Sequence, residues 1–155
     1  MIKIIAVGKI KEKSLKKLID DYVKRISYYS SVKIIEVNDE PNSKKTQDEI
    51  IKNIEGQRVL KHIKDNDYVY LLDLNGKEYD SLSFSKSIDD VMTYKSSDIV
   101  FVIGGSLGLS DELIKRSDIR WKLSNCTFPH QIVRLLLVEQ IYRAFSILNN
   151  LPYHK

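Results

Sequence analysis

The stretch Ile99-Val-Phe-Val-Ile-Gly-Gly-Ser-Leu-Gly-Leu109 decides the class of fold. Its opening run, Ile99 to Ile103, is entirely apolar, as is typical of a strand buried on both faces of a sheet. The glycines that follow end the strand, and Ser110 with its two acidic successors is a typical helix start. A strand covered on both faces belongs to a parallel sheet with helices on each side. The stretch therefore predicts an α/β fold.

The rest of the chain repeats this alternation in both directions. Apolar or β-branched runs predict strands at 2–7, 32–37, 68–72 and 99–103, with a short strand near 121–124. Apolar residues at helical spacing lie between them, over 15–26, 50–63, 84–92 and 131–149. We therefore predict a single domain over residues 1–155, with a mostly parallel sheet of about five strands and helices on both faces.

Three local signals refine this prediction. Thr46 with Glu49 has the form of a capping box, which predicts a helix start at that point. Gly56 is a possible interruption of the same helix. Asn75-Gly76 predicts a tight turn directly after the third strand.

Composition limits the classes of protein that the chain can represent. A length of 155 residues with 43% hydrophobic content suffices for one sizeable core. No apolar run approaches the roughly 20 residues that span a bilayer, and the amino terminus lacks the features of a secretory signal. The single cysteine, Cys126, agrees with a reducing compartment, so we expect a cytoplasmic protein without a membrane partner. His62, His130 and His154 are far apart in sequence, so no metal site is predicted.

Charge is unevenly distributed along the chain. The formal net charge is +4, and residues 1–33 and 101–155 are basic whereas residues 34–100 are acidic. If the fold brings both basic ends onto one face, that face has the character of a phosphate-backbone binder. The alternative is that the lysines from Lys9 to Lys17 form a solvated helix face.

Three loops after predicted strands are the candidate site, at 72–76, 103–108 and 123–130. In parallel sheets ligands bind beyond the carboxyl ends of the strands. The glycines of the second loop permit positive φ and close approach of a ligand, although the loop lacks the residues of a phosphate-loop nucleotidase. The third loop offers backbone groups over an apolar floor, which suits a planar heterocycle. We expect Cys126 to be a small buried residue, and His130 to be a capping residue, a packing residue or a base.

The final predicted helix is apolar almost all round, which requires cover on nearly every side. We interpret it as the interface of a homodimer, with a central core helix as the alternative. Arg134 and Arg143 lie two and a half turns apart and therefore fall on opposite faces.

Together these segments resemble the RlmH family of SPOUT-superfamily methyltransferases. The resemblance rests on Ile-Gly-Gly-Ser-Leu-Gly-Leu from Ile103, on Leu-Ser-Asn-Cys-Thr-Phe-Pro-His-Gln-Ile-Val-Arg from Leu123, and on the terminal Pro-Tyr-His-Lys. It covers nearly the whole chain from Ala6 onward. The family methylates N3 of a pseudouridine in 23S ribosomal RNA of the large ribosomal subunit. The resemblance implies a C-terminal trefoil knot, a homodimer and S-adenosyl-L-methionine as cofactor.

Carried over by position, the resemblance also implies site residues. Cofactor contacts fall on Leu72, Gly104, Leu123, Ser124, Asn125, Cys126, Thr127 and Phe128, where backbone groups are expected to bind. The tail of Tyr153, His154 and Lys155 matches the RNA-facing end of the family, and Lys155 stands where relatives can have Arg. Arg134 and Arg143 are further predicted RNA contacts. The catalytic candidates are His154, Tyr153 and His130, with His154 preferred as general base over His130, water or solvent.

Two other functions remain as alternatives at this stage. One is an RNA-binding ribosome assembly factor with a vestigial cofactor pocket. The other is a nucleotide-binding α/β protein that uses Gly104 to Gly108 for phosphate. Measured affinity for S-adenosylmethionine or for nucleotides distinguishes them.

Overall fold

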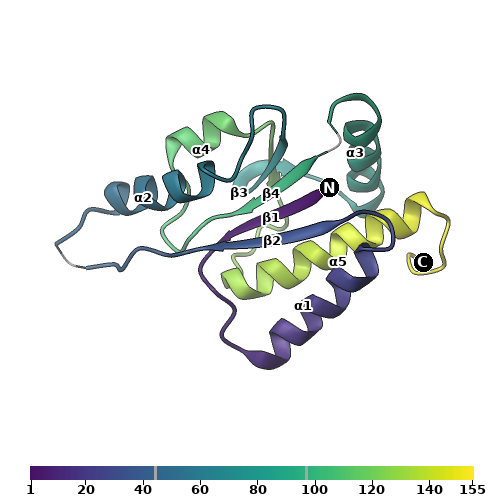
Figure 1. The fold of residues 1–155 in the computed structure, drawn as a ribbon, viewed down its shortest axis with the longest axis horizontal. Coiled ribbons are helices and arrows are strands. Elements are labelled where there is room, and N and C mark those ends of the chain that lie inside the picture. Colours follow the sequence, from purple (N-terminus) through teal and green to yellow (C-terminus); the bar gives the residue numbers. More distant parts are fainter. Residues whose placement is uncertain (44, 97) are drawn as a thin grey trace.

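A computed structural model describes residues 1–43, 45–96 and 98–155. Within these ranges the chain forms a five-stranded sheet in the order β2-β1-β4-β3-β5, and every strand pairing is parallel (Figure 1). The strands are β1 (Ile2–Val7), β2 (Val32–Val37), β3 (Tyr68–Glu78), β4 (Ile99–Ile103) and β5 (Ile119–Lys122). The predicted α/β class is confirmed, and β5 begins and ends two residues earlier than the sequence pattern suggests.

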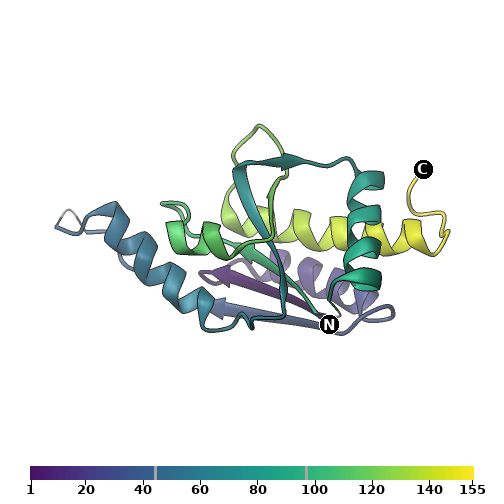
Figure 2. The same ribbon diagram turned by 90° about the horizontal axis from the view of Figure 1, so that it is seen from above.

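Helices cover both faces of this sheet, as predicted (Figure 2). Their bounds are α1 (Lys13–Ile26), α2 (Asp48–Leu60), α3 (Ser81–Tyr94), α4 (Asp111–Arg116) and α5 (His130–Leu148). On one face α1, α3 and α5 pack on alternate strand residues such as Ile4 and Phe101. On the other face α2 and α4 pack on the intervening residues such as Ile5 and Val102. β4 is buried along its whole length because it has a layer of helices on each side.

An aromatic cluster on the α3 side fixes the end of β5. The rings of Phe84 and Trp121 are stacked with centroids 4.2 Å apart, and Phe101 lies beside both. Such aromatic pairs contribute about 0.5–1.5 kcal/mol beyond the area they bury. The short strand β5 is thereby held in place directly before the loop 123–129.

The structure corrects two of the local predictions at α2. The helix begins at Asp48, after Gln47, and Gln47 makes no side-chain capping bond. Thr46 instead hydrogen-bonds the hydroxyl of Ser43, so the predicted capping box is wrong. Gly56 does not interrupt the helix, which continues to Leu60. A glycine is present because the residue packs directly against Ser110, where a larger side chain would collide.

The predicted turn at Asn75-Gly76 is also wrong, because β3 continues to Glu78. Leu72 and Lys77 are both in register with Trp121, so residues 73–76 form a bulge within the strand. A Cβ atom on Gly76 would lie 2.5 Å from the carbonyl group of Arg120. Close backbone approach to β5, rather than turn geometry, therefore explains this glycine.

Candidate functional site

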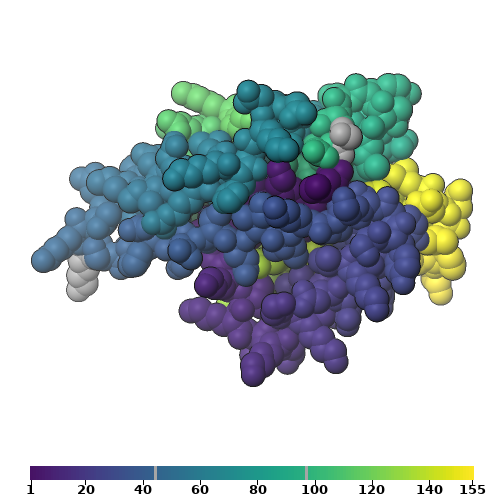
Figure 3. All heavy atoms as spheres, in the orientation of Figure 1, coloured from purple at the N-terminus to yellow at the C-terminus, as the bar shows by residue number. Residues whose placement is uncertain are grey.

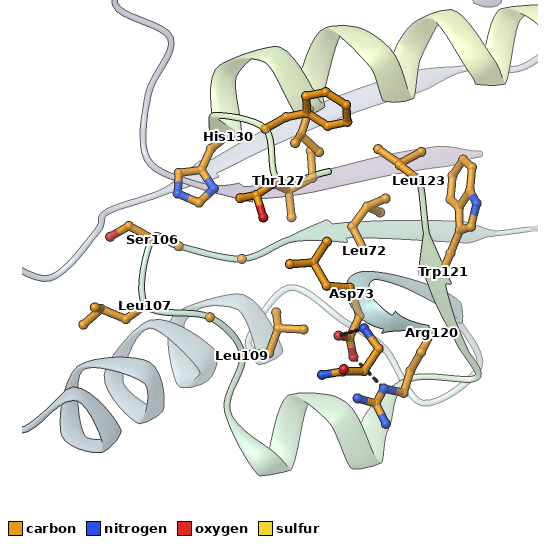
Figure 4. A pocket seen from close by; sticks show the side chains of 18 of the residues that line it. Leu72, Asp73, Ser106, Leu107, Leu109, Arg120, Trp121, Leu123, Thr127 and His130 are labelled. Carbon is orange, nitrogen blue, oxygen red and sulfur yellow. Dashed lines mark hydrogen bonds and ion pairs between the residues drawn. The ribbon is translucent and has the colours of Figure 1, made fainter. Parts of the chain in front are cut away.

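A cleft with a volume of about 430 Å³ lies at the carboxyl ends of β3, β4 and β5 (Figure 4). All three loops singled out in the sequence contribute to its lining: residues from Leu72 to Asn75, from Ile103 to Leu109, and from Leu123 to His130. Loops at this edge of a parallel sheet are free of ladder hydrogen bonds and can present backbone groups to a ligand. The three predicted segments therefore meet at one cleft, as expected, and the cleft remains the candidate site.

The first wall of the cleft is the bulge of β3. Asp73 Oδ2 accepts a hydrogen bond from Arg120 Nε at 2.6 Å, and Asp73 Oδ1 accepts one from the Asn75 amide at 2.9 Å. The Asp73 side chain is nearly buried, so the ion pair ties the bulge firmly to β5. This arrangement holds Leu72 at the floor of the cleft.

The second wall is the glycine loop after β4. The Gly108 amide donates to the Gly105 carbonyl at 3.2 Å, and Gly108 has a φ of +106°. Gly104 and Gly105 do not have positive φ, which corrects the expectation for this loop. They are needed for space instead, because a Cβ atom on Gly104 would lie 2.6 Å from Leu109 Cδ2.

Glu55 of α2 lies behind this glycine loop. Its side chain is 5% exposed, and its Oε2 accepts a hydrogen bond from the Glu40 amide at 3.0 Å. A Cβ atom on Gly105 would lie 2.5 Å from Glu55 Oε1. Burial raises the pKa of the Glu55 carboxyl. Glu55, and Lys52 in the cleft lining, were missed in the sequence because charged residues on a helix look like surface residues.

The third wall is the segment 123–128. Leu123, Ser124, Thr127 and Phe128 line the cleft together with Cys126. Cys126 is exposed, so the expectation of a buried cysteine is wrong: residues 125–127 form an exposed run in the loop between β5 and α5. The Cys126 amide donates to Ser124 Oγ at 3.0 Å, which stabilises the bend. Asn125 accepts from Lys122 Nζ at 2.8 Å and is not part of the lining.

His130 lies at the mouth of the cleft because it is the first residue of α5. Figure 4 shows its imidazole beside Ser106, on the side of the glycine loop. Val133, one turn later, also faces the cleft. Of the three catalytic candidates, only His130 belongs to this cleft within one chain.

Arg134 has a different environment from that predicted. It is only 4% exposed, its Nη1 donates to Glu36 Oε2 at 2.6 Å, and its Nη2 donates to the Gly8 carbonyl at 3.1 Å. Partial burial of Glu36 opposes its ionisation, but hydrogen bonds from Arg134 and the Ile10 amide outweigh this and lower its pKa. Arg134 therefore ties α5 to β1 and β2, and this structure offers its guanidinium no free face for RNA.

The tail lies at the opposite end of α5 from the cleft. Tyr153 Oη donates to Glu139 Oε1 at 3.1 Å and pairs with Tyr22 Oη at 3.1 Å. Burial and these hydrogen bonds raise the pKa of the Tyr153 hydroxyl. His154 contacts Arg143. At 1.5 Å per residue, Glu139 and Arg143, which contact Tyr153 and His154, lie about 14 and 20 Å along α5 from His130.

Two further observations concern the described residues as a whole. None of the helices in them is long and apolar enough to cross a membrane. Among residues 1–43, 45–96 and 98–155, no three His, Cys, Asp or Glu side chains lie close enough together to hold a metal ion.

A parallel sheet whose strand-end loops enclose one cleft, with a long helix starting at its mouth, places the chain in the class of α/β proteins with a cleft of small-molecule size at that edge. The family model described as "Predicted SPOUT methyltransferase" matches residues 1–154, so the chain belongs to the SPOUT methyltransferase family. Among its relatives are proteins named "Ribosomal RNA large subunit methyltransferase H". Those of Clostridium botulinum and Lactobacillus acidophilus are 52% and 50% identical to it, each over 99% of both chains.

Proposed function

We propose that this protein is an enzyme that transfers a methyl group from S-adenosyl-L-methionine to ribosomal RNA of the large subunit. The observation that carries the proposal is the cleft formed by three loops at the strand ends, in a chain of the SPOUT methyltransferase family. The name shared by relatives that match over 99% of this chain supports ribosomal RNA as the substrate. We further propose N3 of a pseudouridine in 23S ribosomal RNA as the acceptor.

The residues of the cleft fit S-adenosylmethionine. A volume of about 430 Å³ lies in the range of small-molecule sites. Leu72, Leu109 and Leu123 give it an apolar floor suited to an adenine ring, and the backbone of the loop 123–128 supplies polar groups around it. Gly104 leaves room for the Leu109 side chain, which lines the cleft. When bound, the cofactor supplies an electrophilic methyl group on a sulfonium.

The protein then has to place the acceptor nitrogen in line with that methyl group, because methyl transfer is an in-line displacement. The imide nitrogen of pseudouridine must lose its proton to react, and His130 at the mouth of the cleft is one candidate to accept it. Tyr153 and His154 are the other side-chain candidates, but they contact Glu139 and Arg143 of α5 and do not line the cleft of their own chain. For either residue to act in the cleft, it must come from a second copy.

We accordingly propose a homodimer in which the tail of each chain reaches the cleft of the other. The outer surface near the start of α5 is apolar: Ile132 is 38% exposed and Leu18 of α1 is 44% exposed, with Leu15 and Pro129 beside them. Figure 3 shows the tail, in yellow, at one end of the molecule and accessible from outside. An antiparallel pairing of two copies along α5, with the two-fold axis between cleft and tail, would bring each tail to the cleft of the other copy.

The same proposal includes the features that the family implies for this chain. These are a single SPOUT domain over residues 1–155, a trefoil knot formed by the C-terminal segment, and a cytoplasmic location where ribosomes are present. Its support for the knot is the match of the family model to residues 1–154.

A methyl-transfer assay tests the proposed function. The protein is incubated with labelled S-adenosylmethionine and, in parallel, with free 23S ribosomal RNA, large subunits or whole ribosomes. We expect label in N3-methylpseudouridine of at least one substrate, identified by mass spectrometry after nuclease digestion. RNA binding without cofactor affinity would instead favour a ribosome assembly factor and would overturn the proposed enzymatic function.

Sedimentation tests the dimer. At micromolar concentration we expect about twice 18.0 kDa, without a folded monomer on dilution. A stable folded monomer that is fully active would contradict the shared site.

A further inference from the structure

One contact in the tail defines the chemistry of His154. Arg143 Nη1 lies 3.2 Å from His154 Nδ1, within hydrogen-bond distance. A guanidinium has only N–H donors and no acceptor. The Nδ1 atom of His154 must therefore accept, and its lone pair is occupied by the protein itself.

This contact selects one form of the imidazole. A neutral imidazole with an accepting Nδ1 carries its proton on Nε2. Both nitrogens of His154 are then used: Nδ1 accepts from Arg143, and Nε2 has a proton to donate. An imidazole in this state has no free lone pair with which to take a proton from a substrate.

Arg143 is itself held rigidly in the donating orientation. Its Nε and Nη2 donate to Glu139 Oε1 at 3.0 and 2.6 Å, and its guanidinium lies 4.7 Å from the ring centroid of Tyr153. The carboxylate of Glu139 stabilises the charged guanidinium and raises the pKa of Arg143. The Glu139 carboxylate thus holds the Arg143 guanidinium in place, and the guanidinium donates to the His154 imidazole.

We propose that His154 acts as a hydrogen-bond donor through Nε2–H to a carbonyl oxygen of the RNA base, with Arg143 and Glu139 as positioning residues. The inference rests on the proposed function and changes the role predicted for His154 from the sequence. In this role His154 does not receive the imide proton, which passes to another acceptor such as His130 or water.

The chemistry of an imide explains why a donor is useful there. When the proton leaves N3, the negative charge spreads onto the two adjacent carbonyl oxygens. The N3 electron pair then forms the new N–C bond while the methyl–sulfur bond breaks, and the sulfur leaves as a neutral thioether. A donor aimed at one of the oxygens stabilises the anion that reacts. Removal of one such donor typically costs about 10²–10³ in kcat.

Substitutions that separate donation from proton transfer test the proposal. In His154→Gln the amide nitrogen reaches the position of Nε2 and can donate, but it cannot act as a base. In His154→Asn the amide reaches only the position of Nδ1, and His154→Ala removes both atoms. We expect His154→Gln to retain kcat within about tenfold of the unaltered enzyme, whereas Asn and Ala lose about 10²-fold or more. Cofactor affinity and sedimentation serve as controls for folding.

A double-mutant cycle between residues 143 and 154 tests the role of Arg143. We expect Arg143→Met to lower kcat several-fold in the unaltered protein and to have a much smaller effect in the His154→Gln background, because an amide has no tautomer to fix. A purely structural role for Arg143 would cost the same in both backgrounds.

The outcomes are distinguishable from failure of the proposed function. If the unaltered protein transfers no methyl group, the proposed function fails. A second outcome is that the unaltered protein is active and the three variants at residue 154 lose activity equally. If the pH–rate profile of these variants also lacks the ionisation of one base, His154 is the base and the donor role is wrong. Equal and full activity in all three variants would remove His154 from the site.

Discussion

Gly104→Val is expected to weaken cofactor binding roughly 30-fold while the protein remains folded. A Cβ atom at this position would lie 2.6 Å from Leu109 Cδ2, whereas carbon atoms pack at about 3.5–4.0 Å. Roughly 1 Å of movement is therefore required, and the flexible Leu109 side chain gives way more easily than the backbone. Leu109 lines the cleft, so displacing it reduces the space available to the cofactor.

The magnitude follows from this geometry. Overpacking of this kind costs about 1–3 kcal/mol, which a domain with about 5–15 kcal/mol of stability tolerates. A loss of about 2 kcal/mol in binding corresponds to roughly 30-fold weaker affinity. Calorimetric titration with S-adenosylmethionine measures the loss, and thermal unfolding of the same samples shows that the fold is intact.

A double-mutant cycle with Leu109→Ala provides the control. If the collision with Leu109 causes the loss, the double variant should bind more tightly than Gly104→Val alone, by about 1 kcal/mol or more after correction for Leu109→Ala. Strictly additive effects would refute the collision mechanism. Unchanged affinity in a folded Gly104→Val protein would place the cofactor elsewhere.

Three more predictions concern the tail, the amino-terminal edge and the glycine loop. Deleting residues 153–155 should lower the melting temperature by only a few degrees, because the Tyr142–Tyr153 ring pair and the hydrogen bonds of Tyr153 contribute about 2 kcal/mol. The same deletion should cut methyl transfer at least 10²-fold and leave cofactor affinity unchanged. Lys3→Met should lower the free energy of unfolding, measured in urea, by about 3–5 kcal/mol, because Lys3 Nζ lies 3.0 Å from the buried Asp67 carboxylate. Adding Asp67→Leu should recover much of this loss, because no unpaired buried charge then remains. Glu55→Gln should stabilise the protein at neutral pH, because burial raises the pKa of Glu55 and its charged form opposes folding. The advantage should shrink as pH falls from the raised pKa of the folded state toward the ordinary glutamate pKa of 4.5, and a constant advantage from pH 4 to 8 would contradict this.

Much of the secondary structure, and the segments that line the candidate site, could be predicted from the sequence. The uniformly apolar run of β4 predicted a strand buried on both faces, and Ser110 was correctly placed as the cap of α4, where its Oγ accepts from the Leu113 amide. These features depend on residues close together in the chain, whose burial pattern and capping chemistry are local. The carboxyl ends of parallel strands meet at one edge, so the loops at 72–76, 103–108 and 123–130 could also be assigned to a common site.

The local sequence pattern therefore predicts the alternation of strands and helices and the set of segments that line the cleft. Long-range packing sets the strand order, the bulge that keeps Asn75-Gly76 within β3, the burial of Arg134 against Glu36, and the contact between Arg143 and His154. Each of these depends on partners that are distant in the chain or on backbone packing between strands. The pattern of a local segment indicates whether a side chain prefers to be buried, but the geometry of the fold decides which group it meets there.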